Sequence, residues 1–272
     1  MRAGVLEGRV AVITGSSRGI GRAIALELAA AGASVVLNGR DSGRLEESRQ
    51  AVAGVNGKVI AVCCNVSVPE EAQKLIDETI NHFGRIDILV NNVGLSMRGR
   101  LADLNPEVFR TICESNLLAA VNPTVPAIKY LRETRGSLVF ISSLAGIRGL
   151  PGLSAYCSAK MSLRAIAESV RIEERESGIH VGLVYVGYTE NEPGKETLGA
   201  DGTMRRLRPR TGRGVQTMRS VAVAVIKNIL RRRFITVLTP VGRLNYFMQA
   251  RFPMLVERII IRNIARFDEQ MD

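Results

Sequence analysis

Short apolar segments alternate with longer helical patterns along most of this chain. The short segments are rich in β-branched residues and apolar throughout, which is typical of strands covered on both faces of a parallel sheet. Strands are expected at Val10–Thr14, Ser34–Asn38, Val59–Cys64, Ile88–Asn91, Ser137–Ser142, His180–Val186 and Phe234–Leu238. Helices are expected at Gly19–Ala31, Ser42–Ala53, Pro69–Phe83, Asn105–Leu131, Gly152–Glu176 and Ser220–Arg232. The pattern predicts one α/β domain with a doubly wound, seven-stranded parallel sheet and helices on both faces.

The length and the charge distribution divide the chain into a main domain and an extension. Its 272 residues are 46% hydrophobic, enough for a sizeable core and too apolar for a disordered protein. Residues 1–200 hold 22 Lys and Arg against 21 Asp and Glu, whereas residues 201–272 hold 15 against 5. The net charge of +11 therefore belongs almost entirely to the C-terminal part. We expect a main domain over residues 1–240 and a basic extension over residues 241–272.

Cysteine usage and the N-terminus favour an intracellular, cytoplasmic protein. The four cysteines, Cys63, Cys64, Cys113 and Cys157, have no CxxC spacing, so neither a zinc site nor a dithiol motif is predicted. A disulfide framework is not expected in a chain of this length, which points to a reducing compartment. The N-terminus runs directly into a strand pattern without a signal-peptide sequence, and apolar runs end well before the length of a transmembrane helix. No metal is expected.

The first strand leads into a glycine-rich turn, Thr14–Gly21 (TGSSRGIG), that opens a helix. Glycines let a backbone approach a diphosphate, and the free N–H groups of a helix N-terminus favour negative charge. The turn therefore predicts a dinucleotide site that includes Gly15, Ser17, Arg18, Gly19, Ile20 and Gly21. Its glycine spacing differs from the common dinucleotide fingerprint, so an ordinary tight turn stays open on this motif alone.

Two arginines near this turn indicate which dinucleotide is bound. Sites for NAD typically place an acidic residue at the end of the second strand, where it accepts hydrogen bonds from the ribose 2′-hydroxyl. Here that position holds Asn38, Arg40 follows two residues later, and Arg18 lies in the turn itself. A guanidinium group matches the geometry of a phosphate. The pattern predicts NADP(H) rather than NAD(H), unless both arginines are solvated surface residues.

A second group of polar residues surrounds the fifth strand. Ser143 follows this strand, and Tyr156 and Lys160 lie four residues apart at the start of the next helix, on the same helix face. A neighbouring cation favours the phenolate and lowers the pKa of a tyrosine. Tyr156 is therefore a candidate general acid/base, although a lone Tyr–Lys pair on a helix is usually a surface feature.

Together these motifs resemble the short-chain dehydrogenase/reductase superfamily over about residues 8–240. The motifs are Thr14–Gly21, Asn91–Gly94 (NNVG), Asn116, Ser143 and the Tyr156–Lys160 pair, in the order typical of that family. The resemblance implies a Rossmann-type domain and an oxidoreductase that interconverts a ketone or aldehyde and an alcohol. It also implies a homodimer or homotetramer, formed through the helices at 105–131 and 152–176.

The resemblance also implies a role for each matched residue. Tyr156 would give a proton to the substrate carbonyl oxygen, Ser143 would hydrogen-bond that oxygen, and Lys160 would bind the nicotinamide ribose and lower the pKa of Tyr156. Asn116 would bend its helix and position a proton-relay water. The remaining cofactor contacts would come from Asn92 and Gly94 at the adenosine ribose, Asn65 and Val66 at the adenine, and Gly187 and Thr189 near the nicotinamide.

Several positions depart from the family pattern. Asn65 stands where an Asp is common, and Val93 replaces a common Ala. The sixth strand ends Val186-Gly187 instead of with a Pro-Gly pair, and Asn191 stands where a Thr often contacts the nicotinamide amide. Thr189 is the candidate replacement. The changes at Val186-Gly187 and Asn191 concern the nicotinamide side of the site, and all the changes leave the predicted catalytic residues in place.

Two basic segments remain outside the strand–helix alternation. Tyr188–Val215 is expected to form a long loop over the substrate, and its arginines are either solvated or bind an anionic group of the substrate: Arg205, Arg206, Arg208, Arg210 and Arg213. Met254–Phe267 is expected to be an amphipathic helix with an arginine stripe at Arg258, Arg262 and Arg266. This helix could pack on the domain or a second subunit, or contact an anionic membrane surface.

These features lead to one main functional prediction and two alternatives. The main prediction is an NADP(H)-dependent oxidoreductase acting on a lipophilic carbonyl or alcohol. The alternatives are a non-catalytic NADP(H)-binding regulator or scaffold, and a reductase of an acyl thioester on an acidic carrier. Nucleic acid is not an expected partner, because Trp is absent and only 4% of residues are aromatic, too few for a stacking platform.

Overall fold

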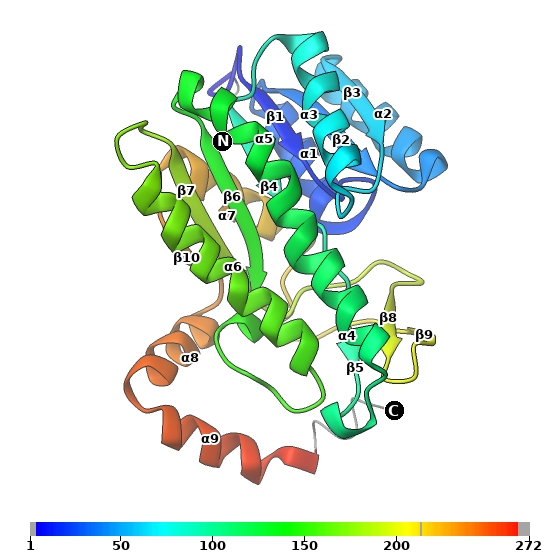
Figure 1. The fold of residues 1–272 in the computed structure, drawn as a ribbon, viewed down its shortest axis with the longest axis vertical. Coiled ribbons are helices and arrows are strands. Elements are labelled where there is room, and N and C mark those ends of the chain that lie inside the picture. Colours follow the sequence, from blue (N-terminus) through cyan, green and yellow to red (C-terminus); the bar gives the residue numbers. More distant parts are fainter. Residues whose placement is uncertain (1–3, 213, 266–272) are drawn as a thin grey trace.

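The computed structural model describes residues 4–212 and 214–265, which form a central parallel sheet between two layers of helices (Figure 1). The strands lie in the order β10-β7-β6-β4-β1-β2-β3, and every neighbouring pair is parallel. Their bounds are β1 Val10–Ile13, β2 Ser34–Gly39, β3 Val59–Cys63, β4 Ile88–Asn91, β6 Ser137–Ser143, β7 His180–Val186 and β10 Ile235–Val237. The predicted seven-stranded, doubly wound sheet is confirmed. From β1 the strand order runs in one direction to β2 and β3 and in the other to β4, and such sheets bind ligands in the crevice at this switch point.

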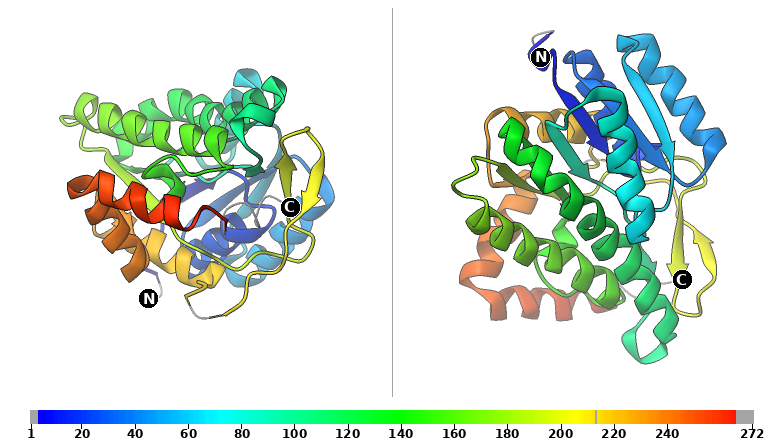
Figure 2. Two further views of the ribbon diagram at one scale, coloured as in Figure 1. Left: turned by 90° about the horizontal axis from the view of Figure 1, so that it is seen from below. Right: turned by 45° about the horizontal axis from the view of Figure 1, so that its top comes forward.

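Helices cover both faces of this sheet (Figure 2). One face packs against α1 Gly19–Ala30, α2 Ser42–Asn56 and α7 Met218–Leu230, which share one core cluster with the strands. The other face packs against α3 Pro69–Phe83, α5 Ala119–Thr134 and α6 Ser154–Glu173, in a second core cluster. The helix α4, Pro106–Cys113, precedes α5. Because both faces are covered, a ligand is expected at the strand ends rather than on a face of the sheet.

The helix expected at Asn105–Leu131 is divided into three parts. Between α4 and α5 lies a π-helical turn, Glu114–Leu118, with Asn116 at its centre. Asn105 begins α4 as its N-cap, and its side chain accepts a hydrogen bond from the Glu107 N–H at 2.9 Å. Single π-helical turns often lie at functional sites, since they turn side chains away from the regular helical path. Here the turn places Asn116 beneath the cavity.

The segment Tyr188–Val215 is not the continuous loop that the sequence predicts. It contains β8, Glu196–Gly199, and β9, Met204–Arg206, which form an antiparallel hairpin. The hairpin joins β5, Met97–Arg98, through parallel pairing of β5 with β8. These strands are too short to show a hydrophobic periodicity in the sequence. Their pairing also depends on a contact between residues about a hundred positions apart. The resulting small sheet lies beside the open edge of the main sheet (Figure 1).

The C-terminal part contains two helices where the sequence analysis expects one. The first, α8, spans Pro240–Arg251, and its N-cap Thr239 accepts a hydrogen bond from the Gly242 N–H at 2.9 Å. The second, α9, spans Pro253–Arg262, because Pro253 lacks an N–H and begins a new helix. The expected positions Arg266 and Phe267 lie outside the described residues. In the portion of the chain that the structure describes, no helix is long and apolar enough to cross a bilayer.

Candidate active site

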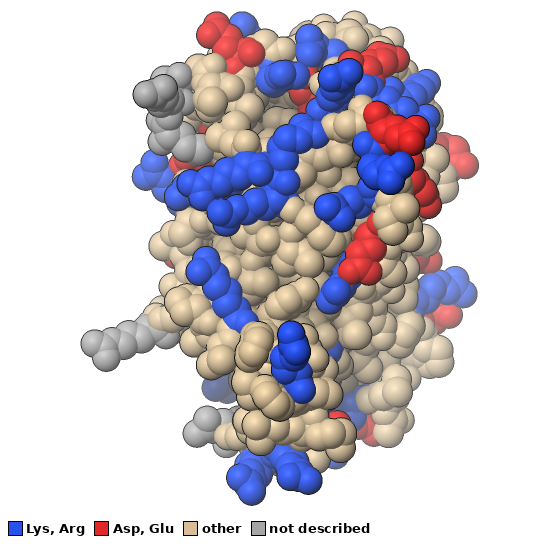
Figure 3. Space-filling model, turned by 90° about the vertical axis from the view of Figure 1, so that its left-hand side faces the viewer, with Lys and Arg blue, Asp and Glu red and all other residues tan. Residues whose placement is uncertain are grey.

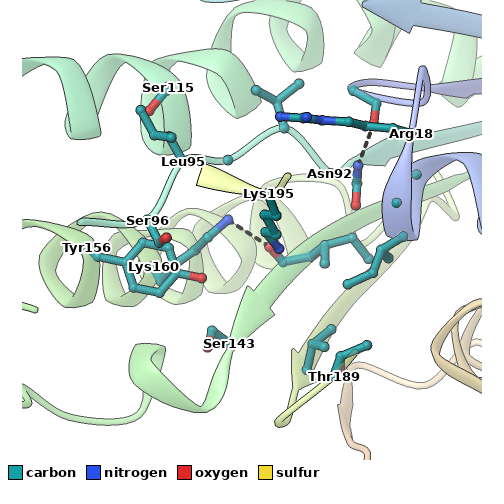
Figure 4. Close-up of a pocket in the computed structure, with 18 of the residues that line it drawn as sticks. Arg18, Asn92, Leu95, Ser96, Ser115, Ser143, Tyr156, Lys160, Thr189 and Lys195 are labelled. Carbon is teal, nitrogen blue, oxygen red and sulfur yellow. Dashed lines mark hydrogen bonds between the residues drawn. The ribbon is translucent and has the colours of Figure 1, made fainter. Parts of the chain in front are cut away.

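A cavity of about 570 Å³ opens at the carboxyl ends of the parallel strands. Its lining extends from the β1–α1 turn at one end to Ser143, Tyr156 and Lys160 at the other (Figure 4). The small β5-β8-β9 sheet and the segment after β7 cover part of it. A cavity of this size, placed at the chain reversal of a parallel sheet, is of the kind that holds cofactors and small substrates.

The glycine-rich turn has the backbone shape that a dinucleotide requires. Gly15 and Gly19 have φ values of +62° and +61°, which favour glycine. A Cβ at Gly21 would overlap the Gly15 carbonyl oxygen and lie 2.6 Å from Asn92 Nδ2. Ser17, Arg18 and Ile20 also line the cavity. The turn therefore leaves an open cradle at the N-terminus of α1 that fits the diphosphate of a dinucleotide.

Two side-chain amides, the buried Asn38 and the partly buried Asn92, hold this turn in place. The Gly15 N–H donates to Asn38 Oδ1 at 3.3 Å, and Asn38 Nδ2 donates to the carbonyl oxygens of Val62 and Cys64 at 3.3 and 3.1 Å. Asn38 is 1% exposed. Asn38 lines the cavity, as expected of a cofactor residue, but its side chain is buried and hydrogen-bonded to the backbone, and its contact with a cofactor stays a prediction. Its role is to join the turn to β3.

Asn92 supports the same turn from the other side. Its Nδ2 donates to the carbonyl oxygens of Thr14 and Gly15 at 3.0 Å each, and its orientation toward the turn is visible in Figure 4. Its N–H donates to Thr14 Oγ1, also at 3.0 Å. The expected cofactor residue Asn92 thus acts first on the backbone that would carry the diphosphate.

The predicted catalytic residues come together at the other end of the cavity. Tyr156 and Lys160 extend from the first turns of α6, and Ser143 ends β6. Burial raises the pKa of Tyr156, and this outweighs the hydrogen bond with the Ser143 side chain and the positive charges of Arg210 and Arg98, which lower it. At neutral pH Tyr156 is therefore a protonated phenol, the form that can give a proton to a carbonyl oxygen.

Lys160 does not act on Tyr156 as the sequence analysis expects. Its Nζ donates to the Ile141 carbonyl oxygen at 3.1 Å and lies 6.0 Å from the centre of the Tyr156 ring. Burial, followed by the positive charge of Lys195, lowers the pKa of Lys160 to about 8. The pKa of Tyr156 is raised rather than lowered, because burial of the phenol outweighs the nearby cations. The lowering of the Tyr156 pKa that the Tyr–Lys spacing predicts is therefore not seen in this arrangement, and the binding of the nicotinamide ribose by Lys160 stays a prediction.

Asn116 is buried under the same end of the cavity. Its Nδ2 donates to the carbonyl oxygens of Leu95 and Ile112 at 2.8 and 2.9 Å, but its Oδ1 has no hydrogen-bond partner among the described residues. A Cβ at Gly94 would lie 2.6 Å from that oxygen and 3.0 Å from Lys160 Nζ. An unpaired buried oxygen is costly, so this atom is suited to accept a hydrogen bond from a bound group.

The expected residues at the adenosine end lie around the cavity as well. Arg18, Arg40, Asn65 and Val66 all line it. Asn65 Oδ1 accepts hydrogen bonds from the N–H and Oγ of Ser67, at 3.3 and 2.8 Å, so this side chain shapes its own turn. The two arginine side chains form no ion pair with a described residue. Both guanidinium groups are thus available to an anion.

At the nicotinamide end, the structure gives the unusual Val186–Asn191 segment a defined backbone. Thr189 Oγ1 donates to the Gly187 carbonyl oxygen at 3.1 Å, and Thr189 pairs with Gln216 in an isolated bridge.

Asn191 does not face the cavity: its Oδ1 accepts from the Arg210 N–H and its Nδ2 donates to the Arg208 carbonyl oxygen, each at 3.2 Å. Gly187 and Thr189 line the cavity, and Asn191 ties this segment to the strand-like stretch after β9.

The structure adds charged residues that the sequence analysis does not single out. The Gly19 N–H donates to Glu192 Oε1 at 2.6 Å, so a carboxylate lies at the N-terminus of α1. Lys195 acts electrostatically on both Lys160 and Arg18, and lies between them in Figure 4. Arg98 enters the cavity from β5. No motif marks these residues, because only the folding of 188–215 over the cavity brings them there.

The arginines of this segment have different surroundings. Arg210 lines the cavity, whereas Arg205 and Arg206 belong to the exposed strand β9, and Arg205 forms an ion pair with Asp201 at 3.4 Å. Arg208 contributes its backbone to the Asn191 contact. Arg213 lies outside the described residues. Among the residues that the structure describes, no cluster of His, Cys, Asp and Glu could hold a metal ion.

Comparison with known families agrees with this fold and site. The family model described as short chain dehydrogenase matches residues 9–200. This chain therefore belongs to the short-chain dehydrogenase/reductase family, whose members use a nicotinamide cofactor. This membership agrees with the predicted resemblance to that family.

Similar proteins include oxidoreductases of lipid-like compounds. A 3-dehydrosphinganine reductase of Danio rerio is 31% identical over 87% of this chain and 73% of its own length. The 11-beta-hydroxysteroid dehydrogenase 1A of Arabidopsis thaliana is 36% identical over 69% of this chain, but the match spans only 54% of that relative. The chain thus spans about half the length of this plant enzyme.

Solved structures share the fold. A short chain dehydrogenase/reductase from Burkholderia phymatum, in complex with NAD, superposes with a TM-score of 0.79 at 21% identity and covers 92% of this chain and 96% of its own. An alcohol dehydrogenase from the archaeon Thermococcus sibiricus, complexed with 5-hydroxy-NADP, has a TM-score of 0.72 at 26% identity and covers 85% and 95% of the two chains.

The contact between Glu192 and Gly19 predicts that removing this carboxylate strengthens dinucleotide binding. A diphosphate at the turn would need the same N–H group, and Glu192 adds a negative charge where an anion binds. In Glu192→Ala the Kd for NADPH should fall about fivefold, which corresponds to the free energy of interaction between one charge and a helix N-terminus. Titration of NADPH fluorescence measures this change.

The matched control is Glu190→Ala, which removes the same charge from the same segment. Glu190 Oε1 accepts from the Met218 N–H at 2.8 Å, at the start of α7, and not from the glycine-rich turn. An unchanged Kd in Glu192→Ala, or an equal gain in the control, would contradict the assignment.

Proposed function

We propose that this protein is an NADP(H)-dependent oxidoreductase that interconverts a lipophilic ketone or aldehyde and the corresponding alcohol. The observation that carries the proposal is the assembly of Ser143, Tyr156 and Lys160 at one end of a cavity whose other end is an open glycine-rich turn. One end fits a diphosphate and the other fits a carbonyl group, which is the arrangement that hydride transfer requires.

The chain's own residues would move the proton and fix the substrate. A bound NADPH would supply the hydride to the carbonyl carbon. Tyr156, kept protonated by burial, would give its proton to the carbonyl oxygen, and Ser143 would hydrogen-bond that oxygen and orient it. Lys160 would bind the nicotinamide ribose, and the unpaired Asn116 Oδ1 would hold a water for proton return to Tyr156.

Three features support NADP(H) over NAD(H). Arg18 and Arg40 line the cavity near the end of β2, without ion pairs to described residues, and are suited to a 2′-phosphate. No acidic side chain occupies the end of β2, where Asn38 is bound to the backbone. Gly39, the last residue of β2, also has no side chain that could accept hydrogen bonds from a ribose 2′-hydroxyl.

The substrate side of the cavity supports a lipophilic compound. Several apolar side chains line it near the catalytic residues: Leu95, Leu144, Leu150, Leu153 and Leu207. The names of the plant steroid dehydrogenase and the fish dehydrosphinganine reductase also point to lipid-like substrates for those relatives. A carbonyl attached to an apolar skeleton fits such a lining, because burial of apolar surface would provide much of the binding free energy.

The alternative of a non-catalytic NADP(H)-binding regulator predicts a different result for one substitution. Tyr156→Phe removes the proton donor and keeps the ring, so an enzyme should lose about 10²–10⁴-fold in kcat with NADPH Kd unchanged. NADPH oxidation with a panel of lipophilic ketones, followed by absorbance, measures kcat. Equal rates in wild type and Tyr156→Phe would contradict the proposed role of the phenol.

The helices α8 and α9 support a peripheral contact with an anionic membrane surface. Most of their large apolar side chains are exposed, including Val241 at 75%, Met254 at 64% and Ile261 at 58%, and only Val256 of α9 is buried. Basic side chains lie among a largely uncharged surface on the face that holds these helices (Figure 3). We propose a cytoplasmic protein that associates with membranes through residues 241–272.

Sedimentation with anionic liposomes tests this contact. The full-length protein should sediment with vesicles at low salt and remain in solution at high salt, since the attraction of arginines to anionic lipid is screened. Deletion of residues 241–272 should abolish the effect. If the protein instead stays in solution with vesicles and forms a dimer that this deletion disrupts, a second subunit covers these helices and the membrane proposal fails.

A further inference from the structure

Arg98 is a partly buried cation in the cavity that has no anionic partner among the residues that the structure describes. It lies at the end of β5, where pairing with β8 fixes its backbone next to Gly199. Burial and the nearby positive charge of Arg210 lower its pKa. The groups that act in the opposite direction are Tyr188, Tyr156 and Cys157, none of which is a carboxylate, and no carboxylate among the described residues pairs with Arg98.

Arg210 brings a second guanidinium to the same place. Its side chain stacks on Tyr188, with 4.5 Å between the guanidinium carbon and the ring centre, and its Nη1 donates to the Thr189 carbonyl oxygen at 3.5 Å. Its N–H donates to Asn191 at 3.2 Å. Arg210 is thus held by its own segment, and its position beside Arg98 is fixed by contacts rather than by an acidic neighbour.

Two arginines that repel each other in a partly buried site raise the free energy of the protein. A bound anion would offset this cost, because it would accept charge-assisted hydrogen bonds from both guanidinium groups. Arg98, Arg210 and Tyr156 all line the cavity, and both arginines act electrostatically on Tyr156, so an anion that they hold would lie on the Tyr156 side of the cavity. The 2′-phosphate of the cofactor does not account for them, since Arg18 and Arg40 occupy that end of the cavity.

We propose that Arg98 and Arg210 form a binding site for an anionic group of the substrate, a carboxylate or a phosphate monoester. This inference rests on the proposed function and narrows the substrate class to a lipophilic ketone or aldehyde that carries a negative charge close to its carbonyl. The leucine lining takes the apolar skeleton, and the two arginines take the charged end. Arg98 and Arg210 are then the residues that determine specificity.

The test separates anion binding from catalysis. Protein saturated with NADP⁺ is titrated by calorimetry with octanoate, octyl phosphate and octan-1-ol, which share an apolar chain and differ in charge. The proteins are the wild type, Arg98→Met, Arg210→Met and Arg98→Lys. The control is Arg206→Met, which removes the same charge from exposed β9. Thermal unfolding and the Kd for NADP⁺ show whether each variant is folded and binds the cofactor.

In the wild type, at least one anionic probe should bind about tenfold more tightly than the alcohol. This ratio corresponds to the net free energy of a hydrogen bond to a charged group. The advantage should disappear in Arg98→Met and Arg210→Met, be partly retained in Arg98→Lys and be intact in Arg206→Met. The preferred anionic probe identifies the headgroup. Equal binding of anions and alcohol in the wild type, or an advantage that survives both Met variants, would overturn the proposal. So would a loss of NADP⁺ binding in these variants, which would assign the arginines to the cofactor.

Turnover then distinguishes this inference from the proposed function. Wild-type rates with 3-oxooctanoate and with its methyl ester compare a charged and a neutral ketone of the same skeleton. A preference for the acid, lost in Arg98→Met through a higher KM, is expected. Rapid reduction of both compounds without a preference would leave the oxidoreductase in place and overturn the anion site. Anion binding as predicted, without reduction of any carbonyl compound, would retain the anion site and remove the proposed function.

Discussion

The cavity depends on two side-chain amides, one buried and one partly buried, that fix the shape of the β1–α1 turn. Asn38 hydrogen-bonds to the turn and to the backbone around β3, and Asn92 hydrogen-bonds to it from the end of β4. Three strands therefore determine where Gly15 and Gly19 present their backbone. Because these amides satisfy buried polar groups on both partners, losing either would leave donors or acceptors unpaired in the core. The shape of the turn that would hold the diphosphate therefore depends on the hydrogen bonds that connect it to β2, β3 and the end of β4.

The basic side chains in this cavity are partly removed from water, which disfavours their charged forms. Burial lowers the pKa values of Lys160, Lys195 and Arg98, which means that the folded protein resists their ionisation. Such a site is stabilised when anions enter it, and the chain offers two places for them, one at the glycine-rich turn and one beside Tyr156. At the glycine-rich turn the Glu192 carboxylate accepts the hydrogen bond that a bound anion would accept. An anion that binds there would displace this carboxylate, so binding is linked to the arrangement of residues 188–215.

The sequence predicts the main sheet and the turn well, because both are encoded locally. The helix α3 begins at Pro69 and ends at Phe83, followed by the C-cap Gly84, and its predicted bounds are confirmed. The small β5-β8-β9 sheet could not be predicted, since its strands are too short for a period and pair across distant positions. For the same reason Arg98 and Glu192 carry no sequence signal as site residues. The pKa of Tyr156 depends on burial, which a spacing of four residues cannot reveal.

The central claim is that the cavity binds NADP(H) in preference to NAD(H) and presents it to Tyr156. Side-by-side fluorescence titrations of the purified protein with NADPH and NADH test it without knowledge of the substrate. We expect NADPH to bind at least about tenfold more tightly, as two guanidinium contacts to a phosphate require, with the preference lost when Arg18 and Arg40 are both replaced by Met. Equal affinity for the two cofactors would contradict the role of these arginines, and binding of neither would contradict the account as a whole.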